Sequence, residues 1–254
     1  MYHYYIDYQL MIKKFRSKQV AIIIPAFNEE ENIEKLIKKI NYYVKKPIII
    51  LVDDSPSFKT SEIIKKKKIK VKYFHRKNKA GRGSAVIFGI KKIIRNRKIK
   101  AVIEMDADFS HAPSEIPRNL NYFFETKLDL LISSRYLKKS KILNWPISRR
   151  ILSYYANKLA RLLLSIPVSD YTNGFRIYSK SSCKTILQKC GRIGDGFIIL
   201  SEILQEINYK NLKIGEIDTV FINRTRGESS VNLNSFIVSL IGLLKLFFKK
   251  KKFK

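Results

Sequence analysis

Short apolar runs and amphipathic stretches alternate along the first half of the chain. The runs are mostly β-branched or aliphatic and are bounded by charged or turn residues, as buried strands are. They are Val20–Ile24, Ile48–Val52, Ile69–Phe74, Ala101–Met105 and Leu128–Ser133. Between them apolar residues recur at helical spacing, as at Ile33, Leu36, Ile37 and Ile40. This order predicts an α/β fold with a mostly parallel central sheet and right-handed crossovers.

Polar residues mark the starts of the predicted helices. Asn28 is suited to cap the first helix, and Glu29, Glu30 and Glu31 then fall in its first turn, where negative charge is favourable. Thr60 is the corresponding cap before the second helix. The other helices of this half are predicted from Arg76–Ala85 to about Arg95 and over Ser114–Glu125.

The second half departs from the strict alternation. It contains a basic loop at Tyr136–Trp145, a helix at Ile147–Leu164, a turn into a short strand at Asp170–Tyr178, a helix near Ile198–Ile207 and a strand near Lys213–Ile222. Neither an internal repeat nor a linker interrupts the pattern. The sequence therefore predicts one domain over residues 19–231, with an N-terminal arm at 1–18 and a C-terminal tail at 232–254.

The C-terminal tail is apolar and then strongly basic. Phe236–Phe248 is too short to span a bilayer, and five lysines follow within Lys249–Lys254. This pattern is typical of an amphipathic basic helix lying in the bilayer interface, where each lysine near anionic lipid contributes about 1 kcal/mol. The alternative is a last core helix with a frayed basic end. No other run suggests a spanning helix or a signal peptide, so we expect a peripheral protein on the cytoplasmic face of a membrane.

The net charge of the chain indicates an anionic partner but does not identify its class. The formal net charge is +30, from 51 Lys and Arg against 21 Asp and Glu. Nucleic acid, an anionic membrane surface or a phosphorylated substrate would each fit this excess. Because the basic residues are spread along the whole chain and no nucleic-acid module is recognisable, a nucleic-acid-binding protein is the more distant alternative. Only two cysteines occur, Cys183 and Cys190, and they lack metal-like spacing. Because two cysteines do not suggest a disulfide framework, we expect a reducing compartment.

Acidic residues follow two of the predicted strands directly. Asp106 and Asp108 come after Ala101–Met105, and two carboxylates two residues apart on extended backbone point the same way. Their repulsion is relieved by a hard divalent cation with oxygen ligands, and ligands of open α/β sheets collect beyond the carboxyl ends of strands. Asp54, after Ile48–Val52, is placed to meet a ribose or base. The alternative is that all three are turn residues, with Asp108 near a helix start.

Two further segments suggest anion binding. In Arg76–Ala85, Gly81 and Gly83 let the backbone approach a ligand closely, and the neighbouring cations could meet phosphates. This loop is not a Walker A motif, because Gly83 is followed by Ser-Ala. Arg149 and Ser153 are four residues apart in a predicted helix and so share one face.

Taken together, these segments resemble the family 2 glycosyltransferases of GT-A fold, and most of all the dolichol-phosphate mannose synthases and other polyprenyl-phosphate glycosyltransferases. The resemblance covers residues 20 to 230. The matching segments, in order, are Pro25–Glu29, Val52–Asp54, Arg76–Ala85, Met105–His111, Ser134–Tyr136, Trp145–Ser153, Asp170–Arg176 and Asn223–Ser229. It implies a Rossmann-like GT-A domain that transfers mannose from GDP-mannose to a polyprenyl (dolichyl-type) phosphate with inversion, using Mg²⁺ or Mn²⁺.

The resemblance also implies a role for individual residues. Those that it implies for the nucleotide sugar are Pro25, Phe27, Glu29, Val52, Asp54, Asp106, Ala107, Asp108, Arg224 and Ser230. Those for the lipid phosphate are Arg135, Arg149 and Ser153; those for the metal are Asp106, Asp108 and Ser110; and the catalytic pair is Asp108 and Arg135. The partners implied are the donor, the lipid acceptor, the membrane surface and, as in some relatives, a small membrane subunit.

The chain departs from the family at three places. Asp53–Thr60 lacks the usual glycines after the second strand. Ser230 stands where a family lysine contacts the nucleotide phosphates, so Arg226 or Lys79 is the expected substitute. Ser110 stands where some relatives have a glutamine metal ligand. The alternatives that remain are the same reaction with UDP-glucose or another nucleotide sugar, and a membrane scaffold without catalysis.

Overall fold

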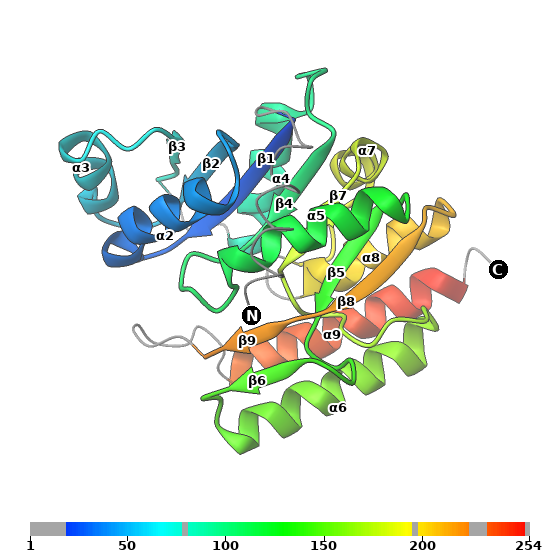
Figure 1. Cartoon of the computed structure of the whole chain (residues 1–254). Coiled ribbons are helices and arrows are strands. Elements are labelled where there is room, and N and C mark those ends of the chain that lie inside the picture. The colour runs from blue at the N-terminus through cyan, green and yellow to red at the C-terminus, as the bar shows by residue number, and fades with distance from the viewer. Residues whose placement is uncertain (1–18, 78–80, 195–197, 224–232, 252–254) are drawn as a thin grey trace.

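The computed structural model describes residues 19–77, 81–194, 198–223 and 233–251, with the side chains of 238–249 in the last range. Among these residues a seven-stranded sheet has the order β3-β2-β1-β4-β7-β5-β8 (Figure 1). Its strands are β1 (Val20–Ala26), β2 (Ile48–Asp53), β3 (Lys72–His75), β4 (Ala101–Glu104), β5 (Leu130–Ser134), β7 (Arg176–Tyr178) and β8 (Ile214–Asp218). A second sheet pairs β6 (Lys141–Leu143) with β9 (Val220–Ile222).

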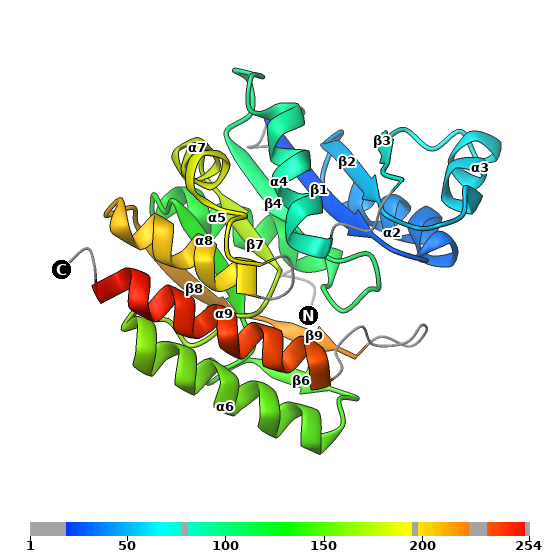
Figure 2. The ribbon, with the colours of Figure 1, turned by 180° about the vertical axis from the view of Figure 1, so that it is seen from behind.

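Helices cover both faces of the main sheet (Figures 1 and 2). They are α2 (Glu30–Tyr43), α3 (Lys59–Lys66), α4 (Gly81–Ile93), α5 (Ile116–Glu125, after the 3₁₀ turn Pro113–Glu115), α6 (Ile147–Leu164), α7 (Lys180–Lys189), α8 (Ile198–Tyr209) and α9 (Leu233–Lys251). The predicted α/β domain with a mostly parallel sheet is confirmed.

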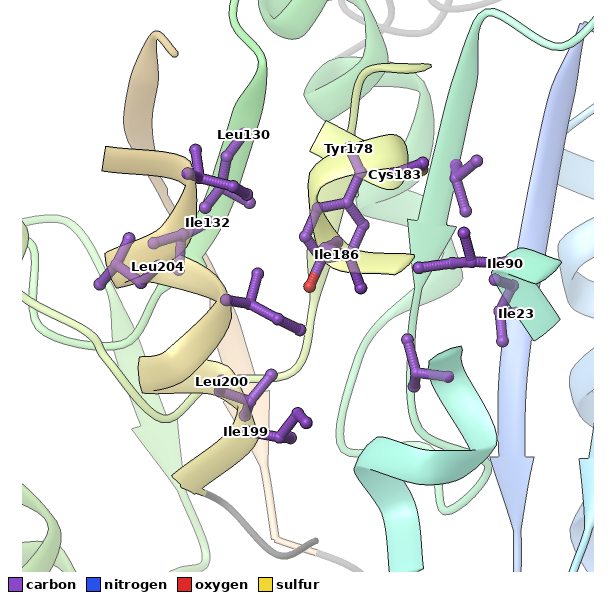
Figure 3. Close-up of a cluster of buried hydrophobic side chains, with 14 of the residues drawn as sticks. Ile23, Ile90, Leu130, Ile132, Tyr178, Cys183, Ile186, Ile199, Leu200 and Leu204 are labelled. Atoms are coloured by element: carbon purple, nitrogen blue, oxygen red, sulfur yellow. The ribbon is translucent and has the colours of Figure 1, made fainter. Parts of the chain in front are cut away.

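Alternation along β1 divides the core between the two faces. Val20, Ile22 and Ile24 pack with the buried residues of α2 and α5. Ala21 and Ile23 point the other way, into the cluster formed with α4, α7 and α8 (Figure 3). This is the side-chain period of two expected for a strand buried on both faces. The sheet is therefore the middle layer of three, and its strand ends meet at a common edge.

Pairing in the second half differs from a simple continuation of the first. β7 lies between β4 and β5 and is antiparallel to both. The single strand expected near Lys213–Ile222 is divided into β8 and β9, which belong to different sheets. The expected loop at Tyr136–Trp145 contributes β6, and α7 has no counterpart in the prediction. These differences follow from partners distant in sequence, which local patterning does not identify.

Both predicted helix caps are wrong. The residue before α2 is Glu29, which makes no side-chain cap bond, while Asn28 has φ = 56° and its N–H donates to Ser55 Oγ at 2.8 Å. The residue before α3 is Phe58, and Thr60 is buried in the first turn. At Asn28, the contact with Ser55 in the β2–α3 loop thus overrides the local capping preference.

The C-terminal helix α9 lies between α8 and α6 (Figure 2). Leu243 and Leu246 are buried in the core, Gln205 Nε2 donates to the Leu246 carbonyl at 3.1 Å, and Lys249 pairs with Glu206 at 2.6 Å. One face of α9 is thus part of the core, as expected if the tail is a last core helix. Over the described residues, none of the helices has the length and apolar content that a bilayer crossing requires.

The close approach of α4 to β1 generates a stability prediction. A Cβ at Gly89 would lie 2.6 Å from Ile23 Cγ2, so Gly89→Val should force this interface apart and lower the free energy of unfolding by about 2–3 kcal/mol. Lys91→Val, on the exposed side of the same helix, is the matched control and should change it by less than about 1 kcal/mol. Urea unfolding measures both, and equal effects would contradict the packing described.

Candidate active site

The ends of β1, β2 and β4 bring most of the predicted donor residues to one edge of the sheet. Pro25 pairs in register with Val52, and the N–H of Asp54 donates to the Ala26 carbonyl at 3.0 Å. On the other side of β1, the N–H of Met105 donates to the Ile23 carbonyl at 3.2 Å. Phe27 is exposed and Glu29 is half-buried, whereas the side chains of Val52 and Ala107 are buried in the core.

The carboxylate of Asp54 is held by an arginine. Arg76 Nε and Nη2 donate to its two oxygens, each at 2.6 Å, and Arg76 Nη1 donates to Ser84 Oγ at 2.8 Å. The neighbouring Asp53 is buried and accepts from the Tyr73 hydroxyl at 2.9 Å. Arg76 therefore orients Asp54 and connects the end of β2 to the start of α4. From the sequence, Arg76 is expected only to contact a phosphate.

The acid pair lies in the turn that follows β4. Asp108 and Ser110 are buried, and the Ser110 N–H donates to Asp108 Oδ1 at 3.0 Å. The side chain of Asp106 is 29% exposed, and its backbone N–H donates to His111 Nδ1 at 3.0 Å. The three predicted metal ligands thus occur in one tight turn, with Phe109 at φ = 62°.

His111 fixes this turn to the rest of the domain. Because His111 Nδ1 accepts from Asp106, Nε2 carries the proton and donates to Asn173 Oδ1 at 2.9 Å. The imidazole stacks on Phe175, with ring centres 5.2 Å apart. No role for His111 is predicted from the sequence, although its place at the end of the Met105–His111 motif is a signal.

Arg82, one of the cations of Arg76–Ala85 that the sequence suggests for phosphates, instead binds two carboxylates. Its Nε and Nη2 both lie 2.7 Å from Asp106 Oδ1, and its Nη1 binds Glu104. Glu104 also accepts from the Tyr178 hydroxyl at 2.5 Å. Burial and the adjacent Glu104 carboxylate raise the pKa of Tyr178 well above its usual value, which keeps this hydroxyl protonated and able to donate.

Arg135, at the end of β5, is gripped by Asp170. Its Nε and Nη2 donate to the two Asp170 oxygens at 2.8 Å each, and Nη2 also donates to Thr172 Oγ1 at 2.7 Å. Both residues are buried. Burial opposes ionisation of Asp170, but the charge and hydrogen bonds of Arg135 outweigh it and lower the pKa of this carboxyl.

Aromatic rings connect Arg135 to the predicted lipid-phosphate residues. The guanidinium carbons of Arg135 and Arg149 lie 5.5 and 5.7 Å from the ring centre of Trp145. The Tyr136 hydroxyl donates to Ser153 Oγ at 2.7 Å. The structure therefore brings Arg135, Arg149 and Ser153 into one cluster at the start of α6.

Phe221 joins this arginine cluster to the acid turn. Its ring centre lies 5.3 Å from that of Trp145 and 6.1 Å from that of His111, and its backbone forms a bridge with His111. The predicted residues Arg224 and Ser230, with the suggested substitutes Lys79 and Arg226, lie outside the described residues. The turn that contains Asp106 and Asp108 and the arginine cluster at Trp145 thus both contact the Phe221 ring or its neighbours.

The acid pair, Asp106 and Asp108, fits a divalent cation whose remaining ligands come from a substrate. Within the described ranges, His, Cys, Asp and Glu side chains form no group of three or more placed to hold a metal ion. Mg²⁺ and similar hard ions commonly bind through one or two carboxylates together with substrate phosphates and water. Asp106 and Asp108 satisfy that requirement, provided that a phosphorylated ligand is present.

Comparison with known proteins gives consistent results. The model of the family "Glycosyl transferase family 2" matches residues 21–187. The chain is 33% identical over 174 residues to polyprenol monophosphomannose synthase of Mycolicibacterium smegmatis, covering 67% of this chain and 65% of that protein, just under two thirds of its length. It is 29% identical over 222 residues to undecaprenyl-phosphate mannosyltransferase of Micrococcus luteus, covering 84% and 88%.

Solved structures agree on the fold. A mycobacterial protein superposes with a TM-score of 0.68 at 16% identity, covering 94% of this chain and 77% of the other. Glucosyl-3-phosphoglycerate synthase from Mycobacterium tuberculosis, in complex with Mn²⁺, UDP-glucose and phosphoglyceric acid, gives 0.66 at 16% identity, covering 94% and 83%. At such identity the likeness establishes a common architecture alone.

Removing the charge of Asp170 from its pair with Arg135 should cause a large, pH-dependent loss of stability. Asp170→Asn leaves a buried arginine without its counter-charge, which should lower the free energy of unfolding by about 3–5 kcal/mol at pH 7. Because the folded pKa of Asp170 is lowered, its contribution is present above the unfolded value of about 3.9 and is lost as pH falls through the folded pKa. The difference in the free energy of unfolding between the parent and Asp170→Asn should therefore become smaller at acidic pH.

Asp218→Asn is the matched control for that variant. Asp218 pairs with Arg118 at 3.0 Å, with both side chains more than a third exposed, so its loss should cost less than about 1 kcal/mol. Denaturant unfolding at several pH values measures both variants. A cost for Asp170→Asn no larger than that for Asp218→Asn would refute the role given to the buried pair.

Proposed function

Because this chain belongs to glycosyl transferase family 2, we propose that it transfers mannose from GDP-mannose to a polyprenyl phosphate, with inversion at the anomeric carbon. The names of the two curated relatives, a polyprenol monophosphomannose synthase and an undecaprenyl-phosphate mannosyltransferase, support this choice of sugar and acceptor. The observation that carries it is the placement of the acid turn and the Trp145 arginine cluster on either side of Phe221.

The acid side of Phe221 suits the donor. Asp54, fixed by Arg76, lies at the β2 end where a ribose or base is bound in such sheets, next to Pro25 and Phe27. Asp106 and Asp108 would hold a divalent cation, Mg²⁺ or Mn²⁺, whose charge neutralises the departing diphosphate. One solved neighbour, glucosyl-3-phosphoglycerate synthase, is described with Mn²⁺ and a nucleotide sugar, which supports a cation of this class.

The basic side suits the acceptor phosphate. Arg149 and Ser153 lie one turn apart at the start of α6, half-buried beside Trp145 and Tyr136. Two nitrogens of Arg135 are engaged by Asp170, so we assign to Arg135 the holding of this region and to Arg149 and Ser153 the direct phosphate contacts. Arg224 remains a further candidate from the family resemblance.

The reaction needs little acid–base chemistry from the protein. A phosphate monoester has a second pKa near 6 and is already an anionic nucleophile at pH 7. Its oxygen attacks the anomeric carbon from the face opposite the leaving group; the bond to the diphosphate oxygen breaks, and the electron pair stays on the nucleoside diphosphate. The residues described orient two anions that would otherwise repel each other.

The exposed side of α6 and α9 suits an anionic bilayer. The helices lie side by side, and neither contains an acidic residue (Figure 2). Their exposed apolar side chains are Ile147, Ile151, Leu152, Tyr154, Tyr155, Leu159 and Leu162 on α6, and Val238, Leu240, Ile241, Leu244 and Phe248 on α9. Apolar contact with flanking lysines and arginines is the combination that binds such surfaces. We place the enzyme there, at the cytoplasmic face, with the acceptor's phosphate at Arg149.

The donor is tested by ligand binding and transfer. GDP-mannose with Mn²⁺ at about one hundred times its Kd should add roughly 2.7 kcal/mol of stability and raise Tm by about 5 °C or more. Radiolabel from GDP-mannose should then enter a polyprenyl phosphate. UDP-glucose, with which the solved neighbour is described in complex, is the competing arm of the panel.

Asp108→Ala is the variant that links this activity to the acid pair. It should lose transfer by at least about a hundredfold, because the diphosphate loses its charge stabilisation. Near-normal turnover in Asp108→Ala would refute the site, and preferential binding and transfer of UDP-glucose would replace the proposed donor.

Membrane association is tested on the apolar side of the two helices. Leu162→Glu together with Ile241→Glu should weaken binding to mixed phosphatidylcholine–phosphatidylglycerol vesicles by about tenfold or more, since each change replaces an apolar contact worth roughly 1.5–3 kcal/mol with a repelled charge. Tyr42→Glu, an exposed aromatic position on α2, is the control and should bind as the parent protein does. Equal vesicle binding by all three proteins would exclude this surface.

A further inference from the structure

Arg82 and Glu104 form an ion pair that the proposed reaction does not use. Glu104 is the last residue of β4, and its side chain is 1% exposed; Arg82 reaches it from the first turn of α4. The same guanidinium binds Asp106, two residues beyond Glu104. On extended backbone these two carboxylates project to the same side, so a single arginine can bridge them.

We propose that Arg82 is a positioning residue that fixes the carboxylate of Asp106, and that Glu104 is its buried counter-charge. Together they prepare the acid pair for a divalent cation bound with a nucleoside diphosphate. This inference rests on the proposed function for the identity of that ligand and adds to it the residues that set the affinity of the cation.

The geometry of the guanidinium supports positioning rather than simple charge neutralisation. Nε and Nη2 both lie 2.7 Å from Oδ1 of Asp106, which fixes the direction of the carboxylate; Oδ2 lies 3.9 Å from His111 Nε2. The backbone of Asp106 is held independently by His111. Side chain and main chain of the same residue are therefore anchored from two different elements, α4 and the segment after β4.

Glu104 keeps the charge of the acid pair available. Arg82 alone would neutralise Asp106 and leave Asp108 as the remaining negative group for a cation. The charge of Glu104 cancels that of Arg82, so Asp106 and Asp108 together keep the charge of two carboxylates. The Tyr178 hydroxyl, donating at 2.5 Å, gives the buried Glu104 carboxylate a second hydrogen-bond donor besides Arg82.

The chain provides space for this guanidinium at one glycine. A Cβ at Gly174 would lie 1.8 Å from Arg82 Nη2, and the Gly174 carbonyl accepts from the same nitrogen at 3.3 Å. The neighbouring Asn173 holds His111. One segment between Asp170 and Arg176 thus supports both anchors of Asp106.

The test is a titration of Mn²⁺ in the presence of GDP or UDP, with free Mn²⁺ counted by electron paramagnetic resonance, so that neither sugar nor lipid is involved. The double variant Arg82→Leu/Glu104→Val removes the pair without leaving a lone buried charge. It should weaken Mn²⁺ binding by about 10–100-fold, the usual effect of losing an outer-shell partner. GDP affinity measured without metal should stay within about twofold of the parent's, whereas a general disruption of the donor site would weaken GDP binding as well.

Three more variants separate positioning from folding. Gly174→Ala displaces the guanidinium while keeping both charges and should weaken Mn²⁺ binding in the same direction, which keeps the test decisive if the double variant does not fold. Arg82→Lys keeps the charge without the fork and should also bind Mn²⁺ more weakly. Arg118→Leu, which removes the half-exposed pair with Asp218, is the control and should bind as the parent does.

The outcomes are distinct. Mn²⁺ binding by a folded double variant or by Gly174→Ala within about twofold of the parent would overturn the role of Arg82 and leave the proposed function standing. A parent protein that binds no Mn²⁺ with either nucleotide would overturn the proposed function, and this inference with it.

Discussion

Pairing between arginines and the carboxylates at the sheet edge is the constraint on which this structure depends. A parallel sheet collects the carboxyl ends of its strands at one edge, and here the ends of β2 and β4 are acidic. Arg76 binds Asp54, Arg82 binds Glu104 and Asp106, and Arg135 binds Asp170. Each pair offsets a repulsion or a desolvation cost that would otherwise oppose folding, and each fixes the direction of a carboxylate. Stability and the arrangement of the site therefore have the same physical origin.

The segment from Asp170 to Arg176 connects these pairs. Asp170 holds Arg135 on the basic side, Asn173 holds His111 on the acidic side, and Gly174 makes room for Arg82. The segment is itself held by the buried Arg176, which donates to the carbonyls of Tyr171, Asn173 and Leu200. A change at this segment is expected to disturb donor and acceptor sides together, even though it lies outside the direct contacts proposed for either substrate.

Local pattern predicted the scaffold well and the pairing poorly. The bounds of α6, Ile147–Leu164, agree with the structure, and the acid pair follows β4 as expected, because apolar periodicity decides both. The antiparallel insertion of β7 and the partners of Arg76 and Arg82 depend on residues far away in sequence, which no local rule identifies. Asn28 is not a cap because its backbone N–H binds Ser55, a contact distant in sequence, and α3 begins one residue before Thr60. The assigned roles of the site residues remain predictions.

The proposed function depends above all on a divalent cation held by Asp106 and Asp108 against a nucleoside diphosphate. The most direct measurement is anomalous scattering from crystals grown with Mn²⁺ and GDP. We expect one manganese peak in the acid turn, with carboxylate oxygens at about 2.0–2.6 Å and diphosphate oxygens completing its coordination. A nucleotide bound at the sheet edge with no manganese near Asp106 or Asp108, or manganese bound elsewhere with its diphosphate, would contradict it.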